Sequence, residues 1–383
     1  MKNSTQTLIK SACLLPVLAL TIPAMANVET SSNHERSLLK RIHLLEKKLE
    51  TQLENQSSIL ASSLSQRFNV SAVVELEAFV QDNENTNNSS DASLATVEVA
   101  IHSHLNPYVE AQVLLLHEDG ADQELVVDEG FMALSAPDIP VTLVAGKQVL
   151  GFGNFESHFI SDPLTLELAE SKDTAIKVQF EHLGFYGSAY IFNGDVNEQD
   201  DNNEIKQAGA QLGYVRIHKD SQLKIGVDYI SSLAESEGLV DYLQADDGDA
   251  EIQKTVPAAS IHGFLSFNKW QLLAEYIGAT HAFNKSDLSF ATKGAQPSSY
   301  NLEVSYDFTV LGKPVTLAAA HQKSSEALAL ELPEQRNMLV ASYPLYEKTA
   351  FALEFMQAKD YAVKDGGRNH TDYSLSMQLA AEF

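Results

Sequence analysis

Apolar and polar residues alternate with a period of two through most of the chain from residue 69 onward. The clearest alternating segments are 70–80, 176–180, 223–229, 261–267, 270–276, 300–308, 351–355 and 373–383. A β-strand turns successive side chains to opposite faces, so each segment predicts a strand with one apolar and one polar face. Charged residues recur on one face of strand after strand, as at Glu75, Lys177, Glu275 and Glu354. A soluble sandwich and a membrane barrel both show this pattern, and periodicity alone does not separate them.

The lengths of the connecting segments do separate them. Long connectors are predicted at 81–92, 148–173, 194–204, 231–256, 280–297, 323–334 and 358–370. Tight connectors alternate with them, near 105–107 and at 182–184, 219–220, 268–269, 311–313 and 344–345. Short turns opposite long loops, with about sixteen strands, are typical of outer-membrane barrels. We therefore predict an all-β fold, an antiparallel transmembrane β-barrel of about 16 strands over residues 69–383, with every long loop at one end.

The first 26 residues have the pattern of a signal peptide. Lys2 and Lys10 precede a short apolar run, and Ala24-Met25-Ala26 is a small-x-small cleavage site. Cleavage there would remove Cys13, the single cysteine, and leave no thiol in the mature chain. The protein is then expected to cross the inner membrane and reach the cell outer membrane.

Residues 27–68 are predicted to form a periplasmic helix. Its leucines and Ile42 recur at spacings of three and four between charged residues. A short intermolecular coiled coil and a single amphipathic helix both fit this stripe, because Gln52 and Gln56 interrupt a strict heptad. The coiled-coil alternative would make the protein a homo-oligomer.

Composition and residue spacing argue against several functions. The formal net charge is −26, which argues against nucleic acid as a partner. No nucleophile–base arrangement is legible, so we expect neither an enzyme nor a catalytic residue. His102 and His104 share a strand face, but two ligands do not make a metal site. We expect no metal and no cofactor.

The connector 148–173 is more apolar than the other long loops, with Phe152, Phe155 and several leucines. Such a loop needs a surface to pack on, and in a barrel the inner wall offers one. Local lysines could attract an anion into an otherwise acidic lumen. The candidate ligand-binding residues of the lumen and this loop are Lys147, Phe152, Phe155, Glu156, His158, Asp162, Lys172 and Lys177.

Two stretches carry resemblances. The last strand ends on Phe383, and it resembles the closing strand that the barrel-assembly machinery recognises in bacterial outer-membrane proteins. The runs 127–131, 145–148, 151–157 and 161–164 resemble the LbtU-type siderophore porins of Legionella-like gammaproteobacteria. This resemblance implies a barrel without a plug domain that takes up an iron-chelating small molecule.

The resulting expectation is an outer-membrane porin that admits a small solute, by resemblance a ferric polycarboxylate siderophore. Its partners would be that ligand, outer-membrane lipid and lipopolysaccharide. A general or sugar-selective diffusion porin is the first alternative. An adhesin or structural envelope tether, in which the helix carries the function, is the second.

Overall fold

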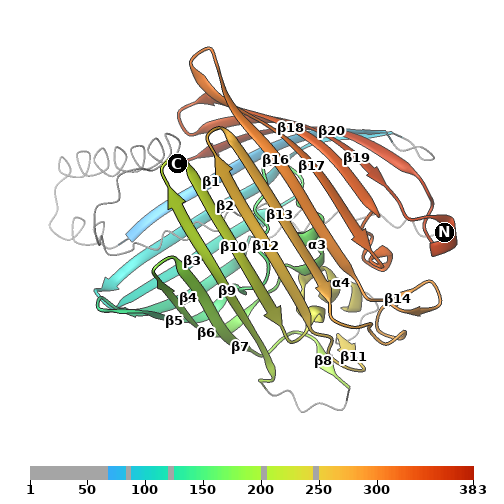
Figure 1. Ribbon diagram of the computed structural model, residues 1–383, viewed down its shortest axis with the longest axis horizontal. Coiled ribbons are helices and arrows are strands. Elements are labelled where there is room, and N and C mark those ends of the chain that lie inside the picture. The colour runs from blue at the N-terminus through green and yellow to red at the C-terminus, as the bar shows by residue number, and fades with distance from the viewer. Residues whose placement is uncertain (1–67, 83–87, 120–124, 200–204, 245–249) are drawn as a thin grey trace.

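The protein forms a closed antiparallel β-barrel in the computed structural model (Figure 1), which describes residues 68–82, 88–119, 125–199, 205–244 and 250–383. The sixteen barrel strands follow one another round the wall in chain order, and β20 pairs with β1 to close it. They are β1 (Phe68–Asp82), β2 (Ser89–Asn106), β3 (Val109–Glu118), β4 (Val126–Ala136), β5 (Ile139–Val149), β6 (Lys172–His182), β7 (Phe185–Phe192), β9 (Gln207–His218), β10 (Ser221–Ile230), β12 (Ala258–Phe267), β13 (Trp270–Ala279), β16 (Ser298–Val310), β17 (Lys313–Ser325), β18 (Gln335–Tyr346), β19 (Thr349–Lys359) and β20 (Thr371–Glu382). The predicted all-β barrel is confirmed.

The strands present their apolar side chains outward. On β13, Leu272 and Tyr276 are 47% and 50% exposed, whereas the intervening Glu275 is 8% exposed. The same alternation leaves Ile176, Val178 and Phe180 of β6 exposed. A soluble sandwich buries its apolar strand faces, whereas a membrane barrel turns them to lipid and turns its polar faces inward. The outer surface is therefore a lipid-facing one.

Short turns join the strands at one end and long loops join them at the other. Several turns contain a left-handed residue, such as Lys219, Asn268, Leu311 and Lys348, which is usual in tight hairpins. The predicted turn at 344–345 is wrong, because Pro344 lies within β18. The β18–β19 register shifts there, so the proline marks a bulge, where its missing N–H is tolerated.

Two other connector predictions need adjustment. The predicted loop 81–92 is shorter, because β1 runs to Asp82 and β2 begins at Ser89. Polar residues here continue the ladder between the two strands, as at Gln81 opposite Ser89. The turn at Pro137 and Asp138 was not predicted.

The end of the chain completes the closure. Ala72 donates its N–H to the Phe383 carbonyl at 2.9 Å and accepts the Phe383 N–H at 3.0 Å. The Phe383 side chain itself is 64% exposed. The C-terminal segment is thus the closing strand that its alternation predicted.

The long loops carry the remaining elements. These are helices α3 (Leu164–Ala169) and α4 (Glu237–Gln244), 3-10 turns η1 (Leu233–Glu235), η2 (Leu328–Leu330) and η3 (Val363–Asp365), and the short strands β8 (Asn197–Glu198), β11 (Glu251–Ile252), β14 (Ser289–Phe290) and β15 (Lys293–Gly294). Within the described part of the chain, no helix has both the length and the apolar character to cross a bilayer. The predicted signal peptide at 1–26 and helix at 27–68 lie outside the described residues, except for Phe68, which begins β1.

Candidate functional site: a loop anchored inside the barrel

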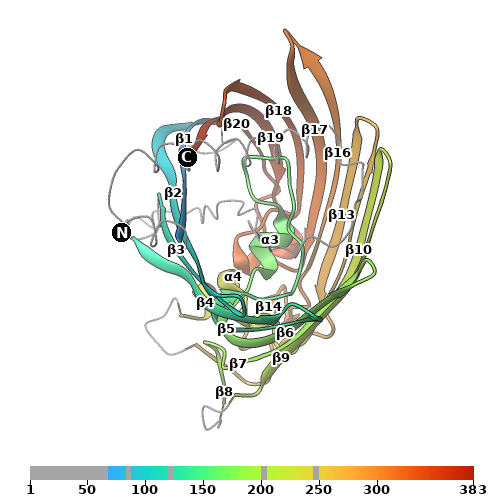
Figure 2. The same cartoon turned by 90° about the vertical axis from the view of Figure 1, so that its left-hand side faces the viewer.

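The third long loop, residues 150–171, lies inside the barrel. Figure 2 shows this loop and α3 within the ring of strands. Helix α3 contacts β13, β16 and β17 of the wall, and α4 of a neighbouring loop. The apolar content of the segment predicted this inward fold.

A series of wall carboxylates binds the first part of the loop. Asp228 on β10 accepts the N–H of Gly153 at 3.1 Å. Glu275 on β13 accepts the N–H groups of Asn154 and Phe155 at 2.6 and 3.3 Å. Each carboxylate is at least nine-tenths buried. The loop backbone thus finds on the wall the partners that regular structure would otherwise supply.

The next two carboxylates repeat the arrangement. Glu303 on β16 accepts the Ser157 hydroxyl at 2.7 Å and the His158 N–H at 3.1 Å. Glu354 on β19 accepts the N–H groups of Ile160 and Ser161 at 2.6 and 3.2 Å. The three glutamates therefore bind residue pairs that begin at 154, 157 and 160. This regular spacing ties one extended segment to three separate strands.

Hydrogen bonds to ionised groups are stronger than those between neutral groups, and an unpaired buried carboxylate is costly. Loop and wall therefore depend on each other. Without the loop, the buried carboxylates would lose their donors, and without the carboxylates the loop would lose its acceptors. The loop is built into the wall at β10, β13, β16 and β19.

Glycine at position 153 makes the first of these contacts feasible. Gly153 has a φ of +86°, and a Cβ there would lie 2.2 Å from the Phe155 ring. Phe155 also has a positive φ, of 51°. The backbone doubles back at this point and directs three successive N–H groups at Asp228 and Glu275. Such a concave run of N–H groups is well suited to an anionic acceptor.

The second part of the loop packs into an apolar core at the long-loop end. Phe152, Leu164 and Leu168 are 1%, 0% and 0% exposed, and they share one cluster with Leu233 and Leu239 of the loop that carries α4. Burying a leucine side chain contributes about 1.5–3 kcal/mol. The long loops thus form one packed layer with the inserted loop.

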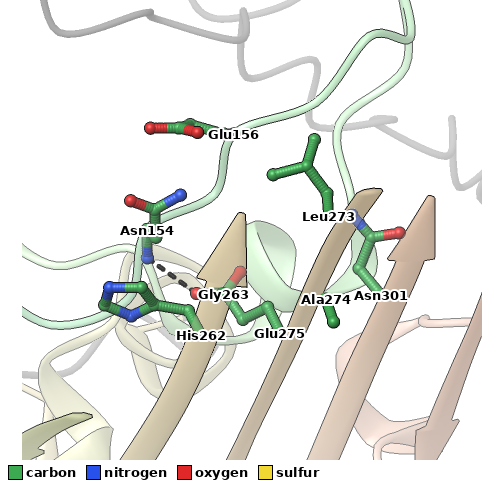
Figure 3. Close-up of a pocket in the computed structure, with 8 residues that line it drawn as sticks. All are labelled: Asn154, Glu156, His262, Gly263, Leu273, Ala274, Glu275 and Asn301. Carbon is green, nitrogen blue, oxygen red and sulfur yellow. Dashed lines mark hydrogen bonds between the residues drawn. The ribbon is translucent and has the colours of Figure 1, made fainter. Parts of the chain in front are cut away.

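Two cationic wall residues pair with two of the acidic side chains of the loop, Glu156 and Glu167. Lys224 on β10 donates to Glu156 at 2.7 Å, beside a small pocket that Asn154, Glu156 and Glu275 help to line (Figure 3). Arg336 on β18 donates to Glu167 at 2.5 Å and to the Asp162 carbonyl at 3.1 Å. Burial raises the pKa of Asp162 well above its usual range, and Glu167 and Glu170 raise it further.

His158 lies between Glu303 and a second strand. Its Nδ1 is 3.1 Å from Glu303, and its Nε2 is 3.3 Å from Gln271 of β13. Burial alone would lower the pKa of His158, but the contact with Glu303 outweighs burial and raises it. The imidazole therefore acts as a structural bridge between loop and wall.

The three predicted lysines lie in different surroundings: one is on the outer face, one is buried in ion pairs and one faces inward. Lys147 is exposed and pairs with Thr174 on the outward-facing side of β5, so it lies beside the loop in sequence but outside the lumen. Lys147 faces outward because it is an even number of residues from Leu143 on the same strand, and Leu143 faces lipid. Lys172 is 8% exposed and paired with Asp128 at 2.5 Å and Glu237 at 3.3 Å. Lys177 has inward parity and has Glu129 as a charged neighbour.

The wall formed by β1–β4 is acidic. Three glutamates of this wall face the inside of the barrel: Glu75, Glu98 and Glu129. Each pairs with a residue of the neighbouring strand that also faces inward. They lie close enough for Glu98 to interact electrostatically with both of the others. The loop anchors lie on β10, β13, β16 and β19, so this acidic wall lies outside the strands that hold the loop.

Sequence reasoning identified the loop but missed its anchors. Asp228, Glu275, Glu303 and Glu354 appeared only as members of the polar strand faces. The available signal was that these carboxylates occupy inward positions of strands on one side of the barrel. Which loop they bind depends on barrel closure, and no local pattern reports that.

Comparisons with known proteins find relatives in sequence. No protein-family model matches the chain. A UPF0422 protein of Legionella pneumophila strain Lens is 26% identical over 302 residues, which cover 73% of this chain and 56% of that protein. A UPF0422 protein of Coxiella burnetii is 25% identical over 325 residues, which cover 82% and 69%. The chain spans about half the length of the Legionella relatives it matches.

Solved structures are similar in fold. The outer-membrane channel DcaP of Acinetobacter baumannii aligns with a TM-score of 0.58 at 11% identity, over 82% of this chain and 97% of that one. Pseudomonas putida OprB aligns with a TM-score of 0.59 at 8% identity, over 84% and 96%. The fold is that of an outer-membrane porin. At these identities the likeness concerns the fold alone.

Proposed function

We propose that the protein is an outer-membrane channel for small hydrophilic solutes. The observation that carries this proposal is the loop held inside a closed barrel by wall carboxylates on separate strands. A loop fixed inside a barrel narrows the lumen and defines which solutes pass. DcaP, similar in fold, is described as an outer-membrane channel, which supports the same role here.

The inner wall favours neutral and cationic solutes. Glu75, Glu98 and Glu129 line the side opposite the loop anchors, and a low-dielectric wall strengthens the field of such a cluster. Lys147 lies on the outer face, and Lys172 is already paired with two carboxylates. We therefore rank cations above anions as permeant species.

The ferric polycarboxylate siderophore implied by the sequence resemblance is the second candidate. Its support is the inserted loop, which matches the segment that carries the resemblance. Its charge fits the wall less well, since an anionic chelate would approach Glu98 and Glu129 with Lys177 nearby. The two candidates predict opposite ion selectivity.

Barrel orientation and partners belong to the same proposal. Short turns face the periplasm in outer-membrane barrels, so we place the long loops at the cell surface. The exposed Phe383 at the closing strand is available to the assembly machinery, and the outer apolar rows to lipid and lipopolysaccharide. If the predicted helix at 27–68 forms a coiled coil between chains, the protein is a homo-oligomer.

Planar bilayer recording tests this function. In a KCl gradient the reversal potential should show cation selectivity, and Glu98→Gln with Glu129→Gln should reduce it. Asp138→Asn, in an exposed short turn, is the control. Uptake of radiolabelled ferric citrate by cells with and without the gene tests the second candidate. A barrel that conducts no ions would refute the proposed channel function. Anion selectivity together with gene-dependent uptake of ferric citrate would favour the second candidate.

A further inference from the structure

Three metal-ligating side chains meet at the short-turn end of the barrel. His102 and His104 lie on β2, and Glu110 lies on β3. Glu110 Oε1 is 3.0 Å from His104 Nδ1, and Glu110 Oε2 is 3.5 Å from His102 Nε2. One ligand atom from each residue lies within 4.8 Å of the others. Sequence spacing gave two ligands, and strand pairing supplies the third.

The hairpin geometry fixes this arrangement. His102 and His104 are two residues apart, so both side chains point to the inner face. Glu110 pairs directly with His104, and Gln112 with His102, in the β2–β3 register. The register shifts between His104 and Asn106, which places an extra residue beside the turn. Bulges of this kind re-aim side chains locally.

The spacing of the three ligands suits a small divalent ion. Metal–ligand bonds of roughly 2.1 Å in a tetrahedral site put neighbouring ligand atoms roughly 3.4 Å apart. The two histidine–glutamate distances, 3.0 and 3.5 Å to the two oxygens of the Glu110 carboxylate, bracket that value. The imidazole rings meet edge to face, with centroids 4.5 Å apart. The two rings are therefore not stacked, and one ring nitrogen of each lies within 4.8 Å of the other and of a Glu110 oxygen.

We propose that His102, His104 and Glu110 form a binding site for a divalent transition-metal ion of the zinc type. Imidazole nitrogen favours Zn²⁺, Cu²⁺ and Ni²⁺, whereas Ca²⁺ and Mg²⁺ prefer all-oxygen ligands. The side chains are 24%, 45% and 26% exposed, so the lumen reaches the site. Three protein ligands leave a further coordination position for water or a solute group.

The site goes beyond the proposed channel function and does not depend on it. It lies near the acidic inner wall, since Gln112 beside it donates to Glu129 at 3.2 Å. A bound divalent cation would place positive charge on this otherwise acidic side of the lumen. Its class is a small hydrated metal ion rather than an organic ligand.

Isothermal titration of the full chain in detergent with ZnCl₂, after treatment with a chelator, tests the site. The purification tag must contain no histidine. His102→Ala, His104→Ala and Glu110→Gln should each weaken Zn²⁺ binding by at least roughly 10- to 100-fold, the loss known for outer-shell partners of metal ligands. His218→Ala, exposed at another short turn, should bind as the wild type does. Unchanged binding in any of the three ligand variants would overturn the proposal.

A second measurement uses the unaltered protein, so it tests the site even if the variants fail to fold. Diethylpyrocarbonate modifies accessible imidazoles, and mass spectrometry reads each histidine separately. Zn²⁺ should protect His102 and His104 while leaving His218 reactive. Equal modification of His102 and His104 with and without Zn²⁺ would show that the three residues form only an ion-paired cluster.

Discussion

The Ser161 hydroxyl donates a 2.6 Å hydrogen bond to Glu354, 193 residues further along the chain. The same carboxylate accepts the Ser161 N–H at 3.2 Å. Because Glu354 belongs to β19 while Glu275 and Asn154 meet at β13, the loop runs along the inner wall from β13 to β19 and is fixed at both ends of this path. A single flexible tether could not hold it in this way.

Removing the anchors should release the loop from the wall. In the combined variant Glu275→Gln, Glu303→Gln and Glu354→Gln, each amide keeps one carbonyl acceptor but places an NH₂ group where the second carboxylate oxygen accepted from the loop. Hydrogen bonds to charged groups contribute about 1.5–3 kcal/mol each, so we expect the triple variant to show a larger single-channel conductance and faster proteolysis within 150–171. Bilayer recording and limited proteolysis measure these effects.

Glu347→Gln serves as the control, because Glu347 is exposed in a short turn away from the loop. Its conductance should match that of the wild type. If the triple variant is cut readily within the loop but conducts as before, the loop does not form the constriction.

Gly153 should resist substitution. Gly153→Ala places a Cβ 2.2 Å from the Phe155 ring at a φ of +86°, a conformation that costs alanine about 1–2 kcal/mol even without the clash. The loop N–H groups should then leave Asp228 and Glu275, which proteolysis of the loop would report. At Gly130 the added Cβ meets only Val127 at 3.7 Å, so Gly130→Ala is the matched control. Equal protection in both variants would show that the turn at Gly153 is not needed.

The sequence predicted the barrel because its signals are local. Alternation along each strand, as at Leu272, Glu275 and Tyr276, follows from the pleat alone. Loop length and apolar content likewise predicted that 150–171 packs inward. The turn at Pro344 failed because a proline marks either a turn or a bulge, and only the β18–β19 register distinguishes them.

The site was less accessible to sequence reasoning because it depends on contacts between distant strands. The outward orientation of Lys147 is clear only once Leu143, on the same face of β5, is known to face lipid. Glu303 and Glu354 become anchors only when closure brings them to the loop. Similarly, Glu110 joins His102 and His104 through register, whereas the sequence shows only the histidine pair.

The long-loop layer should be more stable at low pH. Glu235 accepts the N–H groups of Asp195 and Val196, but burial dominates and raises its pKa from 4.5 to about 7. A carboxyl with a raised folded pKa stabilises fully below its unfolded pKa, and this stability is lost as pH rises through 4.5 to 7. At about 1.36 kcal/mol per pKa unit, the change is up to about 3 kcal/mol.

Hydrogen exchange of the segment 231–244, corrected for intrinsic rates, measures this effect. Protection should be greater at pH 5 than at pH 8 in the wild type. In Glu235→Gln, which cannot ionise, the difference should shrink. A wild-type protection that rises with pH would contradict the assignment.

Orientation can be tested with single cysteines. The one cysteine, Cys13, lies in the predicted signal peptide, so a cleaved chain would give no background labelling. Lys254 is exposed in the long loop before β12, and Lys219 is exposed in the short turn between β9 and β10. If the long loops face the medium, an impermeant maleimide on intact cells should label Lys254→Cys and leave Lys219→Cys unlabelled. Both should react once the cells are broken, which establishes that each thiol is accessible in the folded barrel. Labelling of Lys219→Cys alone on intact cells would invert the orientation, and would place His102, His104 and Glu110 near the cell surface instead of the periplasm.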